Sequence, residues 1–139
     1  MALLAGVAGS VQVAVMSRLG ERVGIFGALA FASLLQAVLA ALLLLVVRQS
    51  FGSYAAVLRQ PAWLWIGGVM GLFIVLTITF AGPRIGVAAT VGILIAGQLA
   101  MGAVVDQFGL LGSARIAIHW PRLVGIVLLF AGAALSLRK

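Results

Sequence analysis

Residues 92–109 read GILIAGQLAMGAVVDQFG, an apolar stretch with an amide, Gln98, near its middle and an acid, Asp106, near its end. The stretch has the length and apolar character of a helix that crosses hydrocarbon. The whole 139-residue chain shares this character, because 65% of its residues are hydrophobic and 8% are charged, with a mean hydropathy of +1.32. About a quarter of the residues in a soluble domain are charged. The composition therefore predicts an integral membrane protein.

The charged residues divide the chain into five apolar runs. A spanning helix needs about 20 apolar residues, within a range of about 17–25. We predict an all-α fold in which residues 1–139 form a single five-helix transmembrane domain, with Glu21 in the first loop. The predicted spans are 2–19, 24–47, 62–82, 85–105 and 120–137.

Several functional classes are disfavoured by what the sequence lacks. No basic residue precedes Arg18, so we expect the first run to be a retained helix rather than a cleaved signal peptide. The chain has no Cys, one His and two acidic residues, which leaves no thiol chemistry, paired carboxylates or metal cluster. We therefore expect neither an enzyme nor a bound cofactor or metal. The net charge of +7 suits lipid headgroups better than nucleic acid.

The basic residues hardly favour one orientation of the chain in the membrane over the other. With five spans, the N-terminal face carries four basic residues: Arg48, Arg59, Arg115 and Arg122. The opposite face carries five: Arg18, Arg22, Arg84, Arg138 and Lys139. Orientation normally follows an excess of Lys and Arg in cytoplasmic loops. A difference of one allows two interpretations: a weakly biased single orientation, or dual topology, in which the same chain inserts both ways.

The odd number of spans favours an antiparallel homodimer. Many secondary transporters consist of two inverted repeats with a site at the midplane between them. Two oppositely inserted copies of a five-helix chain produce that arrangement without gene fusion. The alternative is an obligate heterodimer with a second, oppositely biased chain.

Small residues predict close helix contacts. Gly67 and Gly71 form a GxxxG pair, Gly97 lies on one face of the fourth span, and a weaker pair, Gly82 and Gly86, brackets a predicted turn at Pro83. Small residues let helix backbones approach closely in lipid.

Three glutamines lie inside the predicted spans: Gln12, Gln36 and Gln98. Such side chains either join helices by hydrogen bonds or contact a transported solute. We assign Gln12 and Gln98 to substrate binding, together with Thr90. Gln12 and Gln98 each lie about two-thirds of the way along their predicted spans.

Three segments carry a resemblance to a known family. They are AGSVQVAVMSRLGERVG (8–24), PAWLWIGGVMGLFIVL (61–76) and GPRIGVAATVGILIAGQLAMGAVVDQFGLLG (82–112), and the GQ followed by D-x-FGL-x-G is the most specific part. The chain resembles the YdcZ-like family, the five-helix branch of the drug/metabolite transporter superfamily. The resemblance implies a small-molecule transporter of the bacterial inner membrane, built from two inverted five-helix units.

The resemblance places the family's polar membrane positions on Gln12, Gln98 and Asp106. Met16 stands where the family usually has an asparagine, and Ala30 stands where a small hydroxyl residue is common. At these two positions the first and second spans lack the polar side chains that the family usually has there, which weakens the expectation of polar substrate contacts on them.

A charge at the bilayer centre is costly and marks ion, proton or substrate handling, but the acids of this chain lie near predicted span ends. We therefore expect a neutral or zwitterionic metabolite rather than cation/proton exchange. For Asp106 two interpretations stand: an ion pair with Arg115 or Arg122, or a gate or proton-binding group. We expect His119 to be a solvated residue at a helix start. Arg84 is interpreted as an orientation charge, or as a cation at the start of the fourth helix, where it would favour an anion. A channel-like facilitator or a structural membrane subunit is the remaining alternative.

Overall fold

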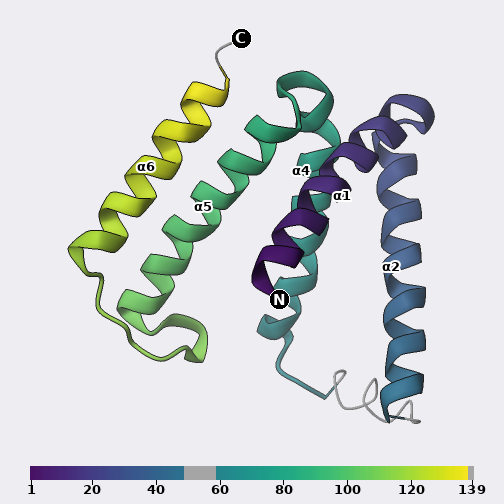
Figure 1. Cartoon of the computed structure of the whole chain (residues 1–139). Helices are drawn as coiled ribbons and strands as arrows, with labels where there is room; N and C mark the ends of the chain where they lie inside the picture. The colour runs from purple at the N-terminus through teal and green to yellow at the C-terminus, as the bar shows by residue number, and fades with distance from the viewer. Residues whose placement is uncertain (49–58, 138–139) are drawn as a thin grey trace. The chain divides into compact units, whose positions relative to one another are not determined.

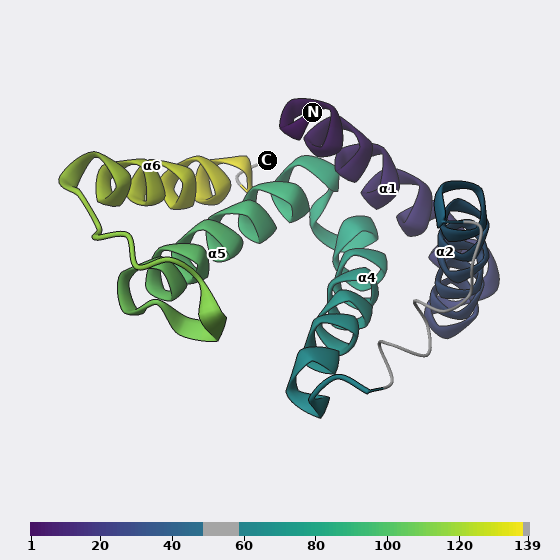
Figure 2. The same ribbon diagram turned by 90° about the horizontal axis from the view of Figure 1, so that it is seen from below.

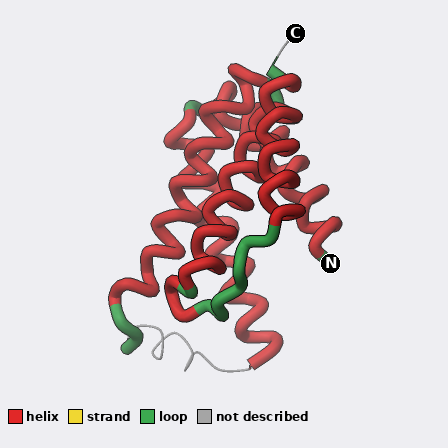
Figure 3. Tube along the Cα trace, turned by 90° about the vertical axis from the view of Figure 1, so that its left-hand side faces the viewer, coloured by secondary structure: helices red, strands yellow, loops and turns green. Residues whose placement is uncertain are grey.

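A computed structural model describes residues 1–48 and 59–137 (Figure 1). The described residues form five α-helices and two short 3-10 helices, and no strand occurs among them (Figure 3). The elements are α1 (Ala2–Val23), α2 (Ile25–Arg48), η1 (Ala62–Trp65), α4 (Ile66–Ile85), α5 (Val87–Phe108), η2 (Leu110–Gly112) and α6 (Trp120–Ser136). The predicted all-α class is confirmed.

Among the residues that the structure describes, four segments are long and apolar enough to cross a bilayer: α1, Ile25–Val47 of α2, α5 and the run Ala62–Ile85, which joins η1 to α4. The fifth helix, α6, is apolar and has 17 residues, the lower end of the spanning length. In α2, only 6% of an 18-residue apolar stretch is buried within the structure. An apolar helix surface that is left this open suits contact with lipid.

The described residues form two compact units. One consists of residues 1–14 and 81–137 and contains α5 and α6. The other consists of the described residues between 15 and 80 and contains α2 and most of α4.

The first helix is longer than predicted. α1 continues to Val23 and includes Glu21, so the placement of this residue in a loop was wrong. Arg and Glu are good helix formers, and Arg18 Nη1 lies 3.4 Å from Glu21 Oε2, one turn along the same helix. The helix ends where Gly24 adopts a φ of 83°, which glycine does without the steric cost of a Cβ.

The turn predicted at Pro83 lies instead at Gly86. Pro83 and Arg84 are inside the last turn of α4, and the chain changes direction at Gly86, whose φ is 86°. A proline near the end of a helix removes only one backbone hydrogen bond, whereas a left-handed residue stops the helix. Arg84 therefore lies at the negative end of a helix dipole, which favours a cation. The predicted anion-favouring position at a helix start was wrong.

In the unit of residues 15–80, Gly20 lies against Thr79. A Cβ on Gly20 would lie 2.7 Å from Thr79 Cγ2. Thr79 is 1% exposed, and its hydroxyl donates a hydrogen bond to the carbonyl oxygen of Val75 at 2.7 Å. Only glycine at position 20 allows α1 to approach α4 this closely.

In the other unit, α5 and α6 lie side by side (Figures 1 and 2). A Cβ on Gly92 would lie 3.3 Å from the Cβ of Ala133. Ala89, Ala96 and Ala103 on α5 are all buried, and their seven-residue spacing places them along one side of the helix. The contact between the two helices therefore relies on small side chains, as is common in membranes.

Candidate functional site

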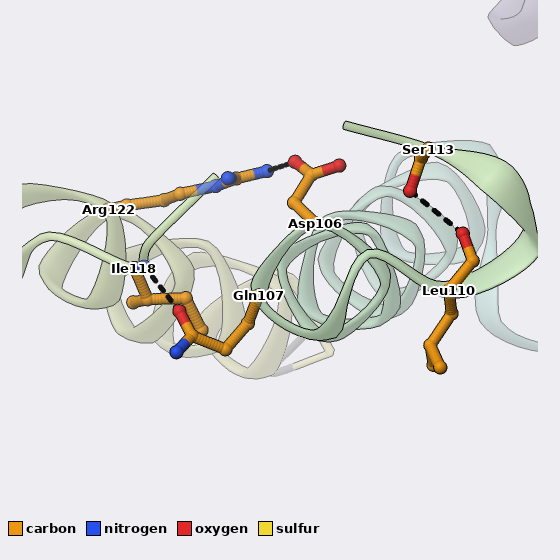
Figure 4. Close-up of polar contacts among 6 residues, drawn as sticks. All are labelled: Asp106, Gln107, Leu110, Ser113, Ile118 and Arg122. Atoms are coloured by element: carbon orange, nitrogen blue, oxygen red, sulfur yellow. Dashed lines mark hydrogen bonds and ion pairs between the residues drawn. The ribbon is translucent and has the colours of Figure 1, made fainter. Parts of the chain in front are cut away.

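A polar cluster joins the end of α5 to the start of α6 (Figure 4). Arg122 Nη2 lies 2.6 Å from Asp106 Oδ2, with the two side chains 29% and 27% exposed. Of the two predicted partners of Asp106, Arg122 is therefore the one in the ion pair. The pair ties α5 to α6, so any separation of the two helices at this end must break it.

The connection between these helices folds back on the end of α5. The Ile116 backbone N–H donates to the Asp106 carbonyl oxygen at 2.7 Å, and Arg115 Nε donates to the Gln107 carbonyl oxygen at 3.1 Å. Gln107 Oε1 accepts from the Ile118 backbone N–H at 2.6 Å (Figure 4). The first two bonds satisfy carbonyl groups that a helix end leaves without partners, and the third satisfies a backbone N–H of the connection. Gln107 was missed in the sequence, where it is simply one more polar residue near a helix end.

Three left-handed residues shape this connection. Gly109, Leu111 and Gly112 have φ values of 61°, 57° and 79°. Leu111 is not a glycine, so its conformation costs roughly 1–2 kcal/mol. The Ser113 hydroxyl donates to the Leu110 carbonyl oxygen at 2.8 Å. Through the hydrogen-bonded loop and the ion pair, Asp106 holds the end of α5 to the start of α6. Its gate or proton-binding role stays a prediction.

The membrane glutamines lie at helix midpoints. Gln12 has ten residues of α1 before it and eleven after it, and Gln98 has eleven residues of α5 before it and ten after it. Gln36 has eleven residues of α2 before it and twelve after it. The predicted two-thirds position of Gln12 and Gln98 was wrong, because α1 and α5 each continue about one turn past their predicted ends. One amide therefore lies at the centre of each of three helices.

These amides make no hydrogen bond within the described chain. Gln98 and Gln36 are exposed and Gln12 is half-buried, and none of the three bonds to a residue of 1–48 or 59–137. Thr90 differs, because it is 2% exposed and its hydroxyl donates to the Gly86 carbonyl oxygen at 2.8 Å. Substrate binding by Gln12, Gln98 and Thr90 stays a prediction.

The glycines predicted for packing lie in open space. A Cβ on Gly67, Gly71 or Gly97 would meet no atom of the described chain within 4 Å. The close approaches occur instead at Gly20 and Gly92. The packing role of Gly67, Gly71 and Gly97 therefore stays a prediction.

His119 is the residue that precedes α6, and it is exposed. This position agrees with a solvated residue at a helix start. Within residues 1–48 and 59–137, no group of three or more His, Cys, Asp or Glu residues lies close enough to hold a metal ion.

Comparison with known families matches nearly the whole chain. The model of the family described as "Putative inner membrane exporter, YdcZ" matches residues 1–135. The chain belongs to the YdcZ family. The match covers four of the five helices completely and the fifth to within one residue of its end. No curated protein and no solved structure matches the chain.

Membership in the YdcZ family agrees with the apolar helices. The chain is a multi-pass protein of the inner membrane and functions in membrane transport. The resemblance described from the sequence is confirmed by the family match.

Proposed function

We propose that the chain is a secondary transporter of a small, neutral or zwitterionic metabolite and that it works as an antiparallel homodimer. The observation that carries the proposal is the placement of acids and amides. Both acidic residues of the chain pair with arginines near helix ends, Glu21 with Arg18 and Asp106 with Arg122. The helix centres carry glutamines instead.

This placement favours uncharged chemistry at the bilayer centre. An ion-coupled site there uses an embedded ionisable group, and neither acid lies at a helix midpoint. An amide donates and accepts hydrogen bonds without carrying a charge. Gln12 and Gln98 therefore suit a solute that presents hydrogen-bonding groups and no net charge.

Two features support the antiparallel dimer: the distribution of the basic residues and the depth of the glutamines along their helices. The four-to-five division of basic residues gives little preference for either orientation. A residue at a helix midpoint stays at the same depth when the whole chain is inverted. Two opposed copies would therefore bring their central amides to one level, where inverted-repeat transporters hold their substrate.

Transport by the purified chain in liposomes tests this function. The chain alone should move at least one uncharged or zwitterionic metabolite of a panel, and flux should persist when no pH gradient is applied. Flux that requires a second, homologous chain would support the heterodimer instead. Flux restricted to organic cations and driven by a proton gradient would contradict the proposed substrate class.

A further inference from the structure

A groove lies between α2 and α4 within the unit of residues 15–80. Its volume is about 600 Å³, and its lining includes Ser33 and Gln36 from α2 and Gly68, Gly71, Leu72 and Val75 from α4. Small-molecule sites usually have volumes of about 300–1,000 Å³ and are mostly apolar with a few polar groups. The groove has the size and the mixed character of such a site.

The groove lies at the middle of both helical segments. Gln36 is at the midpoint of α2, and Ser33 is about one turn before it. Leu72 and Val75 lie on either side of the centre of the apolar run Ala62–Ile85. A solute bound here would therefore be held near the bilayer centre.

The two polar side chains of the groove have no partner in the described chain. Neither the Gln36 amide nor the Ser33 hydroxyl makes a hydrogen bond to a residue of 1–48 or 59–137. Lipid tails offer no hydrogen bonds, so an amide facing only hydrocarbon would lose the bonds that it makes in water. The occupant of the groove must therefore supply hydrogen-bonding groups.

Among the described residues, no charged side chain lines the groove. A charged solute would be desolvated there without a counter-ion, at high cost. Along α4, Gly68 and Gly71 leave open space where other residues would place a side chain, which suits the flat, apolar body of a solute.

We propose that this groove binds an uncharged solute that combines an apolar body with a hydrogen-bonding group, and that Gln36 and Ser33 contact that group. The inference rests on the proposed transport function and narrows its substrate class from neutral or zwitterionic to neutral. Gln36 thereby joins Gln12 and Gln98 as a substrate-contacting amide.

Single cysteines test the groove directly, because the chain has none of its own. The variants are Gln36→Cys and Ser33→Cys, each reconstituted in liposomes as the full chain. The matched control is Leu34→Cys, which lies at the same depth on α2, is 66% exposed and does not line the groove. The probe is N-ethylmaleimide, a small uncharged reagent, and labelling is measured by mass.

A thiol reacts as its thiolate, which forms in water and not in hydrocarbon. We therefore expect Gln36→Cys and Ser33→Cys to be labelled roughly tenfold faster than Leu34→Cys. Two groove variants are used so that poor folding of one does not decide the result.

Equal, slow labelling of all three variants would overturn the site, since it would mean that no water or solute enters the groove. A disulfide formed between two Gln36→Cys copies would also overturn it, because a helix of the second copy would then fill the groove. Labelling does not depend on flux. A chain that transports in liposomes but fails this labelling test retains the proposed function and loses this site.

Discussion

Gln12 and Gln98 lie at matching positions on two helices. Ten residues of α1 precede Gln12, and ten residues of α5 follow Gln98. The first and fourth spans of an alternating chain run in opposite directions, so both amides lie about 15 Å from the same membrane face at 1.5 Å per residue. This is half of the ~30 Å hydrocarbon thickness. Both amides are therefore expected at the bilayer centre, in either orientation of the chain.

The contact between Gly20 and Thr79 gives a first prediction. Gly20→Ala places a Cβ 2.7 Å from Thr79 Cγ2, and overpacking of this kind costs about 1–3 kcal/mol. We expect the free energy of unfolding in detergent to fall by that amount. The matched control is Gly97→Ala, whose Cβ meets no atom of the described chain. It should leave the free energy of unfolding of the single chain unchanged or raise it by up to about 1 kcal/mol, because alanine is the better helix former. Equal losses from both variants would contradict the packing described for α1 and α4.

The ion pair at the end of α5 gives a second prediction. Asp106→Asn and Arg122→Gln should each lower the free energy of unfolding by about 1–2 kcal/mol, because a partly buried charged hydrogen bond is lost. In the double variant the losses should fall short of their sum, with a coupling of about 0.5–2 kcal/mol.

The matched control for this pair is Glu21→Gln. It breaks an ion pair whose side chains are 82% and 47% exposed, and exposed pairs contribute little to stability. Strictly additive losses for Asp106 and Arg122 would show that the two side chains do not interact in the membrane. A change in solute flux without any change in stability would favour a gate role for Asp106.

Helix number and helix type follow from the sequence, because long apolar runs between charged residues permit little else in a membrane. The ends of the helices do not follow. Glu21 marked a loop by its charge, yet α1 continues through it because a charged side chain at the interface can extend into water while its backbone stays helical. Pro83 marked a turn, whereas the glycine that follows at position 86 supplies the left-handed conformation.

Only part of the candidate site could be predicted from the sequence, because the ends of the helices could not be. Errors of about one turn in the ends of α1 and α5 moved Gln12 and Gln98 away from their helix midpoints in the prediction. The pairing of Asp106 with Arg122 was available from the sequence as one of two choices, since only a few basic residues lie on that face. The bond from Ile118 to Gln107 was not available, because it depends on a loop that folds back through three left-handed residues.

The resemblance at Ala30 predicted a loss of polar contacts from the second helix. Gln36 and Ser33 restore polar groups to that helix within two turns. From the sequence, Gln36 has two open roles, helix joining or solute contact, and its exposure beside the groove is what favours solute contact.

Dual insertion is the third prediction. Ser113 lies in the exposed connection between α5 and α6, and a Ser113→Cys variant should be labelled by a membrane-impermeant maleimide from both sides of the inner membrane. Adding lysines to this connection should fix one orientation and reduce flux, because opposed copies could no longer pair. Labelling of Ser113→Cys from one side only would contradict dual insertion.

The role of Gln98 in substrate binding is tested by solute flux in liposomes that contain only the Gln98→Leu chain, compared with the Gln98→Asn chain. Leucine removes the amide, whereas asparagine keeps it on a shorter stem. Since Gln98 makes no hydrogen bond in the described chain, we expect Gln98→Leu to abolish flux while unfolding and dimer stability change by less than about 0.5 kcal/mol, and Gln98→Asn to retain part of the flux. Normal flux through Gln98→Leu, or a dimer loosened by about 0.5–2 kcal/mol with flux otherwise intact, would contradict a substrate-binding amide at the bilayer centre.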